Sequence, residues 1–445
     1  MNPPPPDPSR SNPGTGLLAI RLTGVRPEEA RIVLLSAAYF FCLLSAYYVI
    51  RPIRDQFGVA GGPQDLPPLF TATLAVMLIA HPVFTSIVSR WPRRRFVTVT
   101  YRFFMVCLLA FYVLLQAVPS GSTPWVWVGR SFFVWTSVFN LFVVSVFWSF
   151  MTDIYRERDS RRLFGLIGVG GTLGGIVGSS ITAFLVEVVS VPNLFWFSIL
   201  LLEGAVLCVK ALDRRVGAQS GPKTDGGRDG PRPAPGSVIG GSALEGIKRV
   251  ASSPYLLGIC AFMLLFTFGS TFLYYMLGEF VSGIFVAPEA RAAVYARLDL
   301  AVNTLTLVTQ LFLTGRILKW LGVGLTLAIL PLVSIIGFLS LGAAPIFAVF
   351  VVFWVLRRGV NFAVAIPARE VLFTVLRRRD KYKAKNFNDT VVYRTGDLAG
   401  IWSFNGLGAL GLTTAAMAWS VVPVAGVWLV VALWLGRRQK GLAGG

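Results

Sequence analysis

The chain has 445 residues, of which 55% are hydrophobic and only 14% are charged, and its mean hydropathy is +0.67. A soluble protein of this length needs more charge on its surface, so the composition excludes that class and indicates a membrane protein. The formal net charge of +20 suits basic loops that face anionic lipid. No recognition motif accompanies it, so we expect no nucleic-acid partner.

Runs of about 20 apolar residues, the length that crosses a hydrocarbon core of about 30 Å, follow one another along almost the whole chain. They predict twelve transmembrane helices in two sets of six. The first set is expected at 32–57, 67–89, 96–118, 125–152, 163–187 and 192–212. The second set is expected at 254–283, 293–318, 321–342, 345–374, 387–414 and 418–436. The predicted fold class is an all-α membrane protein.

Two segments outside these runs are rich in Gly and Pro and cannot bury enough apolar surface to fold. The predicted regions are a disordered cytoplasmic N-terminus at 1–31, an N-terminal six-helix bundle at 32–213, a cytoplasmic linker at 214–253, a C-terminal six-helix bundle at 254–436 and a cytoplasmic tail at 437–445. The N-terminal segment lacks the apolar core and cleavage site of a secretory signal. The first helix is therefore expected to insert uncleaved.

Lys and Arg are concentrated in alternate loops between the predicted helices. These loops and the two terminal segments hold 31 of the 41 basic residues, whereas Arg291 is the one clear case in the opposite loops. Because basic residues are retained on the cytoplasmic side of a membrane, both termini are expected to face the cytoplasm. A bacterial inner membrane is the simplest location for such a chain.

Residues that usually carry catalysis or bind metal are scarce. Cys42, Cys107, Cys208 and Cys260 lie inside apolar runs without paired spacing, which favours a packing role over disulfides or metal ligands. His81 is the only histidine, which leaves little material for a zinc site or a histidine-based triad. We therefore expect no catalytic residues, no metal and no cofactor.

Charged residues and a proline stand near the end of the first predicted helix, in the sequence YYVIRPIRDQFG at 47–58. Arg51 and Asp55 are four residues apart and share a helical face with Arg54, and Pro52 is expected to kink the helix. A charge at the bilayer centre costs about 2.5–3.5 kcal/mol, so these side chains are expected to face protein or water. They either snorkel to the membrane interface or contact an anionic solute.

Two further groups of charges lie in the second set of helices. Arg357 and Arg358 stand near the middle of the tenth helix. Neighbours on a helix point about 100° apart, so we expect one to reach a ligand and the other to pair with a neighbouring helix. Arg394 and Asp397 are three residues apart in the eleventh helix. They form either an internal ion pair or a ligand site, in which Asp397 exchanges its partner with the substrate.

Two sites are candidates for a transport pathway or for proton coupling. In the eighth helix, one polar stripe with i, i+4, i+7, i+11 spacing consists of Asp299, Asn303, Thr306 and Gln310. Such a stripe lines either a water-filled path, which we expect here, or another helix. Glu203 is isolated near the middle of the sixth helix and either is a neutral structural residue or carries a proton.

Glycines recur every four residues in the fifth helix, at Gly170, Gly174 and Gly178. Small residues at this spacing let two membrane helices approach closely. A phosphate-binding loop is excluded because no Gly-Lys-Ser/Thr follows. The glycines therefore predict close packing of the fifth helix.

The two sets of helices resemble each other at one point. Thr152, at the end of the fourth helix, and Thr374, at the end of the tenth, are each followed by an arginine-rich turn that contains Arg-Asp. Six plus six helices with parallel halves is the layout of the major facilitator transporters, in which the substrate lies near the midplane between the halves.

Three stretches carry a more specific resemblance. NFAVAIPAREVLFTVL at 361–376, KAKNFNDTVVYRTGDLAG at 383–400 and YYVIRPIRDQFGV at 47–59 are similar to the nucleotide translocases, the bacterial and plastid ATP/ADP exchangers. Matching positions include Pro367 and Glu370 in the first stretch. In three places the family has Lys, Asp and Lys where this chain has Asn361, Ile366 and Asp397. The chain thus resembles a divergent member of that family, within the major facilitator superfamily.

The resemblance implies a secondary active transporter that exchanges an anionic solute related to nucleotides by alternating access, with ATP:ADP antiport as the family's activity. Together with the charge pattern, the resemblance suggests eight substrate-binding residues: Arg51, Arg54, Asp55, Arg357, Arg358, Asn361, Arg394 and Asp397. The expected partners are a small anionic solute and membrane lipid, and a monomer is expected.

Two other functions remain open at this stage. In the first, the chain is a proton-coupled major facilitator carrier of a non-nucleotide solute, with Glu203 or Asp299 as the proton site. In the second, it is a membrane enzyme or a lipid-handling protein. The lack of a nucleophile–base pair argues against catalysis.

Overall fold

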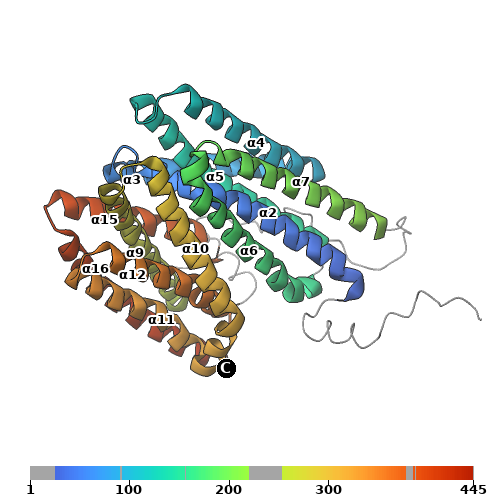
Figure 1. Ribbon diagram of the computed structural model, residues 1–445. Coiled ribbons are helices and arrows are strands. Elements are labelled where there is room, and N and C mark those ends of the chain that lie inside the picture. Colours follow the sequence, from blue (N-terminus) through green and yellow to red (C-terminus); the bar gives the residue numbers. More distant parts are fainter. Residues whose placement is uncertain are drawn as a thin grey trace, which may run out of the picture.

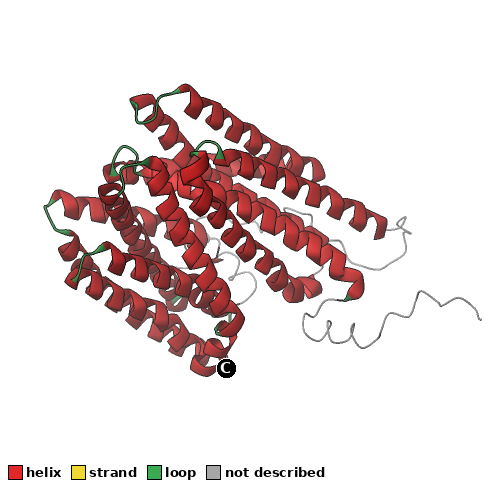
Figure 2. Cartoon of the chain, in the orientation of Figure 1, coloured by secondary structure: helices red, strands yellow, loops and turns green. Residues whose placement is uncertain are grey.

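The structure is a computed structural model that describes residues 26–90, 93–155, 157–219, 253–376, 384–385 and 387–443. Within these ranges every regular element is helical and no strand occurs, which confirms the predicted all-α class. Figure 2 shows long helices joined by short loops. Figure 1 shows them in two groups, one drawn in blue to green and the other in yellow to red.

The first half of the bundle contains six long helices. They are α2 (Pro27–Gly58), α3 (Leu66–Arg90), α4 (Arg93–Ala117), α5 (Thr123–Ile154), α6 (Glu157–Val189) and α7 (Leu194–Gln219), with the short helix η1 (Pro63–Asp65) between α2 and α3. Below, "first half" means these elements. The end of the bundle at which α2 ends and α3 begins is called the loop end, and the opposite end is called the terminal end.

The second half contains α9 (Pro254–Ile284), α10 (Pro288–Phe312), α11 (Thr314–Ala343), α12 (Phe347–Val360), the π-helix η2 (Asn361–Ala365), α13 (Ile366–Leu372), the π-helix η3 (Asn388–Val392), α15 (Tyr393–Ala409) and α16 (Thr414–Ala443). Here α12, η2 and α13 follow one another without a break, so they form one segment at the place of the predicted tenth helix.

Nine helical segments of the described chain are long and apolar enough to cross a membrane. Two others, α10 and α15, do not meet that standard. The α15 helix has 17 residues, and α10 carries Glu289, Arg291, Arg297 and Asp299. The exact number of twelve spans therefore stays a prediction.

Many helix ends differ from the predicted boundaries by a few residues, and three of them lie in segments that were predicted to be outside the bundles. The α7 helix continues to Gln219 and α16 continues to Ala443, past the expected ends at 212 and 436. Arg and Lys follow the apolar runs at both places, and these are good helix formers that extend a helix beyond the apolar layer. The α2 helix starts at Pro27, inside the segment expected to be disordered. Residues 1–25 and most of the predicted linker, 220–252, lie outside the described residues.

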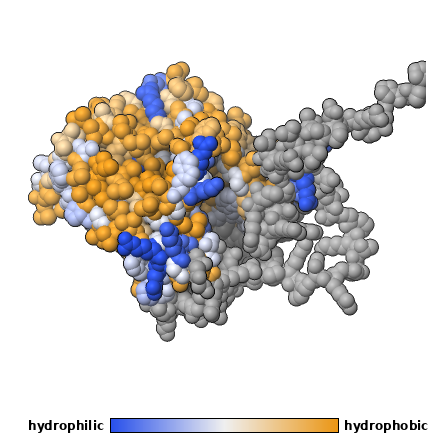
Figure 3. All heavy atoms as spheres, turned by 90° about the horizontal axis from the view of Figure 1, so that it is seen from below, coloured by the Kyte–Doolittle hydropathy of each residue, from blue (hydrophilic) through white to orange (hydrophobic). Residues whose placement is uncertain are grey.

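The surface of the bundle is largely apolar. Large side chains are widely exposed, for example Ile79 at 70%, Val188 at 80% and Trp320 at 71%. In Figure 3 the described part of the visible face is mostly orange, with hydrophilic residues confined to a few places. A surface of this kind would associate in water, and it suits a protein surrounded by lipid.

The glycine pattern of the fifth helix produces the close packing that the sequence predicts. A Cβ atom added at Gly170, Gly174 or Gly178 of α6 would clash with a backbone carbonyl oxygen of α2, that of Ala37, Phe41 or Ser45 respectively. The second half repeats the arrangement, since a Cβ at Gly400 of α15 would lie 2.5 Å from the carbonyl oxygen of Phe268 in α9. Small residues thus set the spacing of one helix pair in each half.

We expect Gly174→Ala to destabilise the protein by about 1–3 kcal/mol, because the added methyl group forces α6 away from α2. The matched control is Gly168→Ala in the same helix, where an added Cβ meets nothing within 4 Å. The control should be neutral or slightly stabilising, since alanine has the higher helix propensity. Thermal unfolding in detergent measures both variants, and equal melting temperatures would contradict the packing role.

The two threonines that mark the internal similarity make the same kind of hydrogen bond, although Thr152 lies in α5 and Thr374 lies in the turn after α13. Thr152 Oγ1 donates to the carbonyl of Ser149 at 2.8 Å, and Thr374 Oγ1 donates to that of Val371 at 2.7 Å. Each hydroxyl thus binds the carbonyl three residues earlier at the terminal end of its helix. The second Arg-Asp turn, in 377–383, lies outside the described residues.

The halves meet most closely at the loop end. One apolar cluster there combines first-half residues such as Leu66 and Phe133 with second-half residues such as Phe272 and Phe338. Two other clusters belong almost entirely to one half each. The α3 helix of the first half also lies against α15 of the second, as Figure 1 shows at its left side.

Candidate functional site

A cavity of about 440 Å³ lies between the two halves, within the range of about 300–1,000 Å³ typical of small-molecule sites. First-half helices α2, α3 and α5 line one wall, and α9, α12 to α13 and η3 to α15 line the other. Six arginines are among the lining residues: Arg51, Arg54, Arg357, Arg358, Arg369 and Arg394. The cavity therefore offers an unusually cationic wall at the level of the membrane.

Arg51 does not snorkel to the membrane interface. It is 8% exposed, and its Nη1 atom lies 2.9 Å from Oδ1 of Asp299 on α10. Its Nε atom is 4.0 Å from Oδ2 of Asp55, one helical turn further along α2. The α2 helix continues through Pro52 to Gly58. The sequence thus placed Arg51 correctly at the cavity, and the structure adds an ion pair that joins the two halves.

Arg54 and Asp55 form the part of the site next to the loop end. Arg54 Nη1 lies 3.5 Å from Asp55 Oδ1, and its guanidinium group is 4.2 Å from the ring centre of Phe133. The same Asp55 oxygen accepts a hydrogen bond of 2.8 Å from the hydroxyl of Tyr274 on α9. Asp55 is 3% exposed and does not line the cavity, so it positions Arg54 and Tyr274 beside it.

Arg357 is a buried cation whose partners are all neutral. It is 3% exposed. Its guanidinium group donates to Ser334 Oγ at 3.0 Å, to Ser270 Oγ at 2.9 Å and to the carbonyl of Phe266 at 3.3 Å. Among the described residues no carboxylate lies within ion-pair distance of it, and the charge is left without a counterion.

Arg358 lines the same cavity without a hydrogen bond or ion pair to any described residue. Its guanidinium group lies 5.0 Å from the ring centre of Trp354 and 5.6 Å from that of Phe362. Asn361, 9% exposed, lines the wall one turn further on. Both neighbouring arginines line the cavity, and Arg357 bonds to α9 and α11, which agrees with the expectation that one of the two pairs with a neighbouring helix. That the other reaches a ligand stays a prediction.

Arg394 and Asp397 form the internal ion pair that the sequence offered as one alternative. Arg394 Nη1 lies 3.3 Å from Asp397 Oδ2, and Thr271 Oγ1 of α9 donates to the other carboxylate oxygen at 2.8 Å. Both residues also line the cavity. Arg394 contacts the first half as well, through Met77 Sδ at 3.1 Å.

A π-helix shapes the wall beside Arg358. Pro367 cannot donate a hydrogen bond to the carbonyl four residues earlier, that of Ala363, and the hydroxyl of Thr314 takes its place at 2.8 Å. Gln310 Nε2 donates to the neighbouring carbonyl of Phe362 at 3.4 Å. Single π turns occur frequently at functional sites, and here η2 presents Phe362 to the cavity.

The polar stripe of α10 packs against helices instead of lining the cavity. Asp299 binds Arg51 of α2, and Asn303 Nδ2 lies 3.5 Å from Ser179 Oγ of α6. Thr306 is buried at 5%, whereas Gln310 supports the π-helix. The path-lining expectation for Asp299, Asn303 and Gln310 is corrected accordingly, because the stripe faces a helix interface.

Glu203 lies away from the cavity. Its carboxylate pairs with Arg102 of α4 at 3.3 Å, and the two side chains are 38% and 54% exposed. The residue is therefore neither isolated nor deeply buried, and its surroundings favour a structural ion pair over the pathway or proton role considered from the sequence.

Several lining residues were not singled out by the charge pattern. They are the polar or aromatic side chains Tyr47, Phe70, Ser137, Asn140, Ser270, Thr271, Tyr274, Trp354, Phe362 and Tyr393. Ser137 and Asn140 are three residues apart in α5, a spacing that places them on one face. That signal was present in the sequence, but serine, threonine and tyrosine also occur at helix contacts, so their residue types alone do not identify a cavity.

Contacts between the halves close the cavity at the loop end. The Tyr274–Asp55 hydrogen bond is one. Trp402 Nε1 of α15 also donates to Thr71 Oγ1 of α3 at 3.2 Å, and Arg291 of α10 donates to the carbonyl of Val59 at 3.4 Å. In the other direction the lining extends to Arg369 and to exposed Asp389, which lie toward the terminal end.

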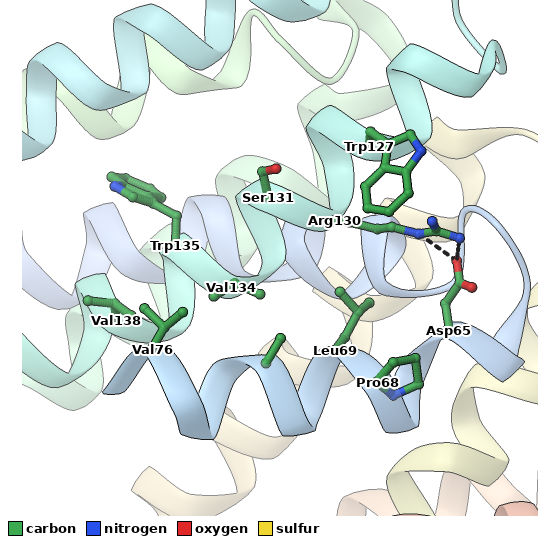
Figure 4. Close-up of a pocket in the computed structure, with 11 residues that line it drawn as sticks. Asp65, Pro68, Leu69, Val76, Trp127, Arg130, Ser131, Val134, Trp135 and Val138 are labelled. Atoms are coloured by element: carbon green, nitrogen blue, oxygen red, sulfur yellow. Dashed lines mark hydrogen bonds and ion pairs between the residues drawn. The ribbon is translucent and has the colours of Figure 1, made fainter. Parts of the chain in front are cut away.

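A second cavity, of about 610 Å³, lies between α3 and α5 within the first half. Its wall is mainly apolar. Figure 4 shows Arg130 at one end reaching to Asp65, with Nε and Nη2 at 3.0 and 2.7 Å from the same carboxylate oxygen. The charge there is already neutralised, so this cavity offers no free cation. The described residues also contain no group of three or more His, Cys, Asp or Glu side chains that could hold a metal.

Comparison with known proteins agrees with this architecture. The model of the Major Facilitator Superfamily matches residues 1–160. ADP,ATP carrier protein 1 of Chlamydia trachomatis serovar D is 22% identical over 500 aligned positions, which cover 95% of this chain and 91% of that protein.

Solved structures with a similar fold include an auto-inhibited POT family peptide transporter, with a TM-score of 0.58 and 13% identity, covering 92% of this chain and 97% of that chain. The human organic anion transporter MFSD10 (TETRAN) has a TM-score of 0.57 and 15% identity, covering 92% of this chain and 100% of that chain.

The chain thus has an all-helical fold like that of the major facilitator transporters, and the relatives and fold neighbours found are transporters rather than enzymes. The similarity to the chlamydial ADP,ATP carrier agrees with the resemblance of the predicted first, tenth and eleventh helices to the nucleotide translocases.

Proposed function

We propose that the protein is a secondary active transporter of an anionic solute related to nucleotides, moved by alternating access of the central cavity. One observation carries the proposal. Arg357 and Arg358 both line the cavity, and neither has a carboxylate within ion-pair distance among the described residues. The similarity to the chlamydial ADP,ATP carrier supports exchange as the mode of transport.

An uncompensated cation in a membrane protein needs a functional reason. Removing a charge from water costs several kcal/mol unless a partner of opposite charge compensates it. Ionisable residues that persist in membrane segments typically mark a substrate or ion pathway. A bound anion would compensate both arginines, and the neutral donors Ser270 and Asn361 at the same wall would complete its hydrogen bonds.

The closed loop end indicates which step of the transport cycle the structure represents. With the termini in the cytoplasm, as the distribution of basic residues predicts, the cavity faces the cytoplasm and is closed toward the other side. Rocking of the halves about the central arginines would then expose the same site on the opposite side. A monomer in a bacterial inner membrane fits this scheme.

A proton-coupled carrier is the second candidate, and one observation favours it. Asp299 Oδ2 is buried and has no hydrogen-bond partner, so that oxygen is free to take a proton, which would neutralise the carboxylate paired with Arg51. This function predicts a flux whose pH dependence disappears in Asp299→Asn. A flux with the same pH profile in the wild type and in Asp299→Asn would remove this candidate.

Uptake into proteoliposomes tests the main proposal. With a panel of nucleotides, sugar phosphates and organic acids, we expect Arg357→Ala and Arg358→Ala each to lower uptake at least about 100-fold, the effect of losing about 2.7 kcal/mol of transition-state binding. Arg102→Ala is the matched control, because Arg102 is paired outside the cavity. Thermal unfolding checks that every variant is folded. Unchanged uptake in both cavity variants would reject an anion site.

A further inference from the structure

The charged groups of the cavity can be sorted by whether each has a partner. At the loop end, Arg51 and Arg54 stand against Asp55 and Asp299, with the three shortest separations at 2.9, 3.5 and 4.0 Å. This group holds two cations and two carboxylates. It is therefore neutral as a whole.

Two other groups are balanced in the same way. Arg394 is paired with Asp397. Toward the terminal end, Lys385 binds Glu370 at 2.7 Å, and Asp389 lies close enough to Arg369 to interact with it electrostatically. Each group has as many carboxylates as cations.

Only Arg357 and Arg358 remain after this pairing, taken over the described residues. Their contacts are hydroxyls, a carbonyl and aromatic rings. Arg358 also interacts electrostatically with Asp299, but this carboxylate lies beyond ion-pair distance of Arg358 and is already paired with Arg51. The excess charge of the cavity is therefore two, although six arginines line it.

We infer that the cavity selects a solute with two negative charges, a phosphomonoester or a dicarboxylate, held by Arg357 and Arg358. The inference rests on the proposed function and narrows its substrate class. A solute with four negative charges would carry two charges that no free cation compensates. These two charges would lie in a region where Asp55, Asp299 and Asp397 already supply negative charge. Screening is weak at such buried sites, so the mismatch carries a large cost.

The excess of two positive charges in the cavity depends on Asp397 as well as on Arg357 and Arg358. Its carboxylate occupies Arg394 at a position that lines the cavity. Replacing it with asparagine would free Arg394 and raise the excess to three. Replacing Arg358 with glutamine would lower the excess to one. The preferred charge of the solute should follow these changes.

The experiment measures binding of adenosine mono-, di- and triphosphate to the purified full-length protein, by thermal stabilisation at pH 7.5 in EDTA. These ligands share one nucleoside and carry about two, three and four negative charges. A ligand that binds only the folded state raises the melting temperature according to its affinity. Succinate and inorganic phosphate are included as small anions without a nucleoside.

For the wild type we expect the monophosphate to bind at least about 10-fold more tightly than the triphosphate, a difference of about 1.4 kcal/mol. In Asp397→Asn the diphosphate should become the tightest ligand. In Arg358→Gln every dianion should weaken at least about 10-fold. Glu203→Gln and Arg102→Gln are the controls, because they remove one carboxylate and one cation outside the cavity. They should leave the order of ligand affinities unchanged.

The outcomes separate this inference from the proposed function. If affinity in the wild type rises with the charge of the ligand up to the triphosphate, the inference of a dianion site is wrong, but the proposed transport of an anion still stands. The inference of a dianion site would also be wrong if Asp397→Asn binds the three nucleotides in the same order of affinity as the wild type. Stabilisation by no anion at all would reject both. Stabilisation by succinate as well as the monophosphate supports a site that recognises charge, and stabilisation by the monophosphate alone supports a phosphomonoester site.

Discussion

Arg357→Met is expected to abolish transport and to leave the folded protein at least as stable as the wild type. Methionine has a similar length and no charge, so it removes a buried cation that lacks a carboxylate among the described residues. Apolar replacement of buried charged groups is often neutral or stabilising. The hydroxyl of Ser334 keeps its own hydrogen bond to the carbonyl of Leu330 at 2.9 Å, so its loss of Arg357 costs little.

Two measurements are needed for Arg357→Met, because each reports a different role. Initial uptake into proteoliposomes should fall at least about 100-fold, equivalent to about 2.7 kcal/mol, whereas the melting temperature in detergent should stay equal or rise. Arg102→Met, at the exposed pair with Glu203, should change neither by much. A large drop in melting temperature would assign Arg357 to folding, and retained uptake would remove it from the substrate site.

The elements that carry the cavity could be predicted because membrane insertion leaves a strong signal. Apolar runs gave the helices, and charges within them at Arg51, Arg54, Arg357 and Arg394 gave lining residues, since a charge inside a bilayer must face protein or water. The glycines of α6 predicted its close packing with a neighbour. Lengths were less certain, because charged helix formers extend α7 and α16 beyond the apolar layer.

The partners of these charges could not be predicted from one sequence. Asp299 has the spacing of a path-lining stripe, but the rotation of α10 turns it toward Arg51 of another helix. Glu203 is isolated in sequence, and only the packing of α7 on α4 brings Arg102 to it. Tyr274 was missed because a tyrosine in an apolar helix carries no distinctive pattern. Contacts between distant helices decide these roles, and helical periodicity alone does not encode them.

The second large effect is expected at the ion pair between Arg51 and Asp299, which joins α2 of the first half to α10 of the second at 2.9 Å. Arg51 also lines the cavity, and Arg358 lies close enough to Arg51 and Asp299 to interact with both electrostatically, so an anion held by Arg357 and Arg358 would weaken this pair. An empty carrier would keep the pair and stay closed at the loop end. A loaded carrier would release it, which couples opening to the presence of a solute.

Asp299→Asn should therefore open the loop end without a solute. The closed state would then hold a buried Arg51 with a weaker partner, and losing one member of a buried pair costs about 3–5 kcal/mol. Opening hydrates Arg51 and avoids that cost. A shift of even about 3 kcal/mol changes the ratio of closed to open protein more than 100-fold. Transport should then run downhill without a counter-solute.

Spin labels on exposed residues of each half measure the shift. Gln64, in η1, and Val286, which follows α9 and is 87% exposed, both lie at the loop end. After the four native cysteines are replaced, the distance between labels at 64 and 286 should lengthen in Asp299→Asn. Efflux from loaded proteoliposomes into solute-free buffer should rise at the same time.

Glu187→Gln provides the matched control. Glu187 of α6 also pairs with α10, through Arg297 at 3.1 Å, but the two side chains are 52% and 57% exposed. An exposed pair contributes about 0–1 kcal/mol, so its loss should change neither the label distance nor the efflux. If Asp299→Asn behaves like this control, the Arg51–Asp299 pair does not hold the loop end closed. If only Asp299→Asn opens it, the Arg51–Asp299 pair beside the solute site keeps the empty carrier closed.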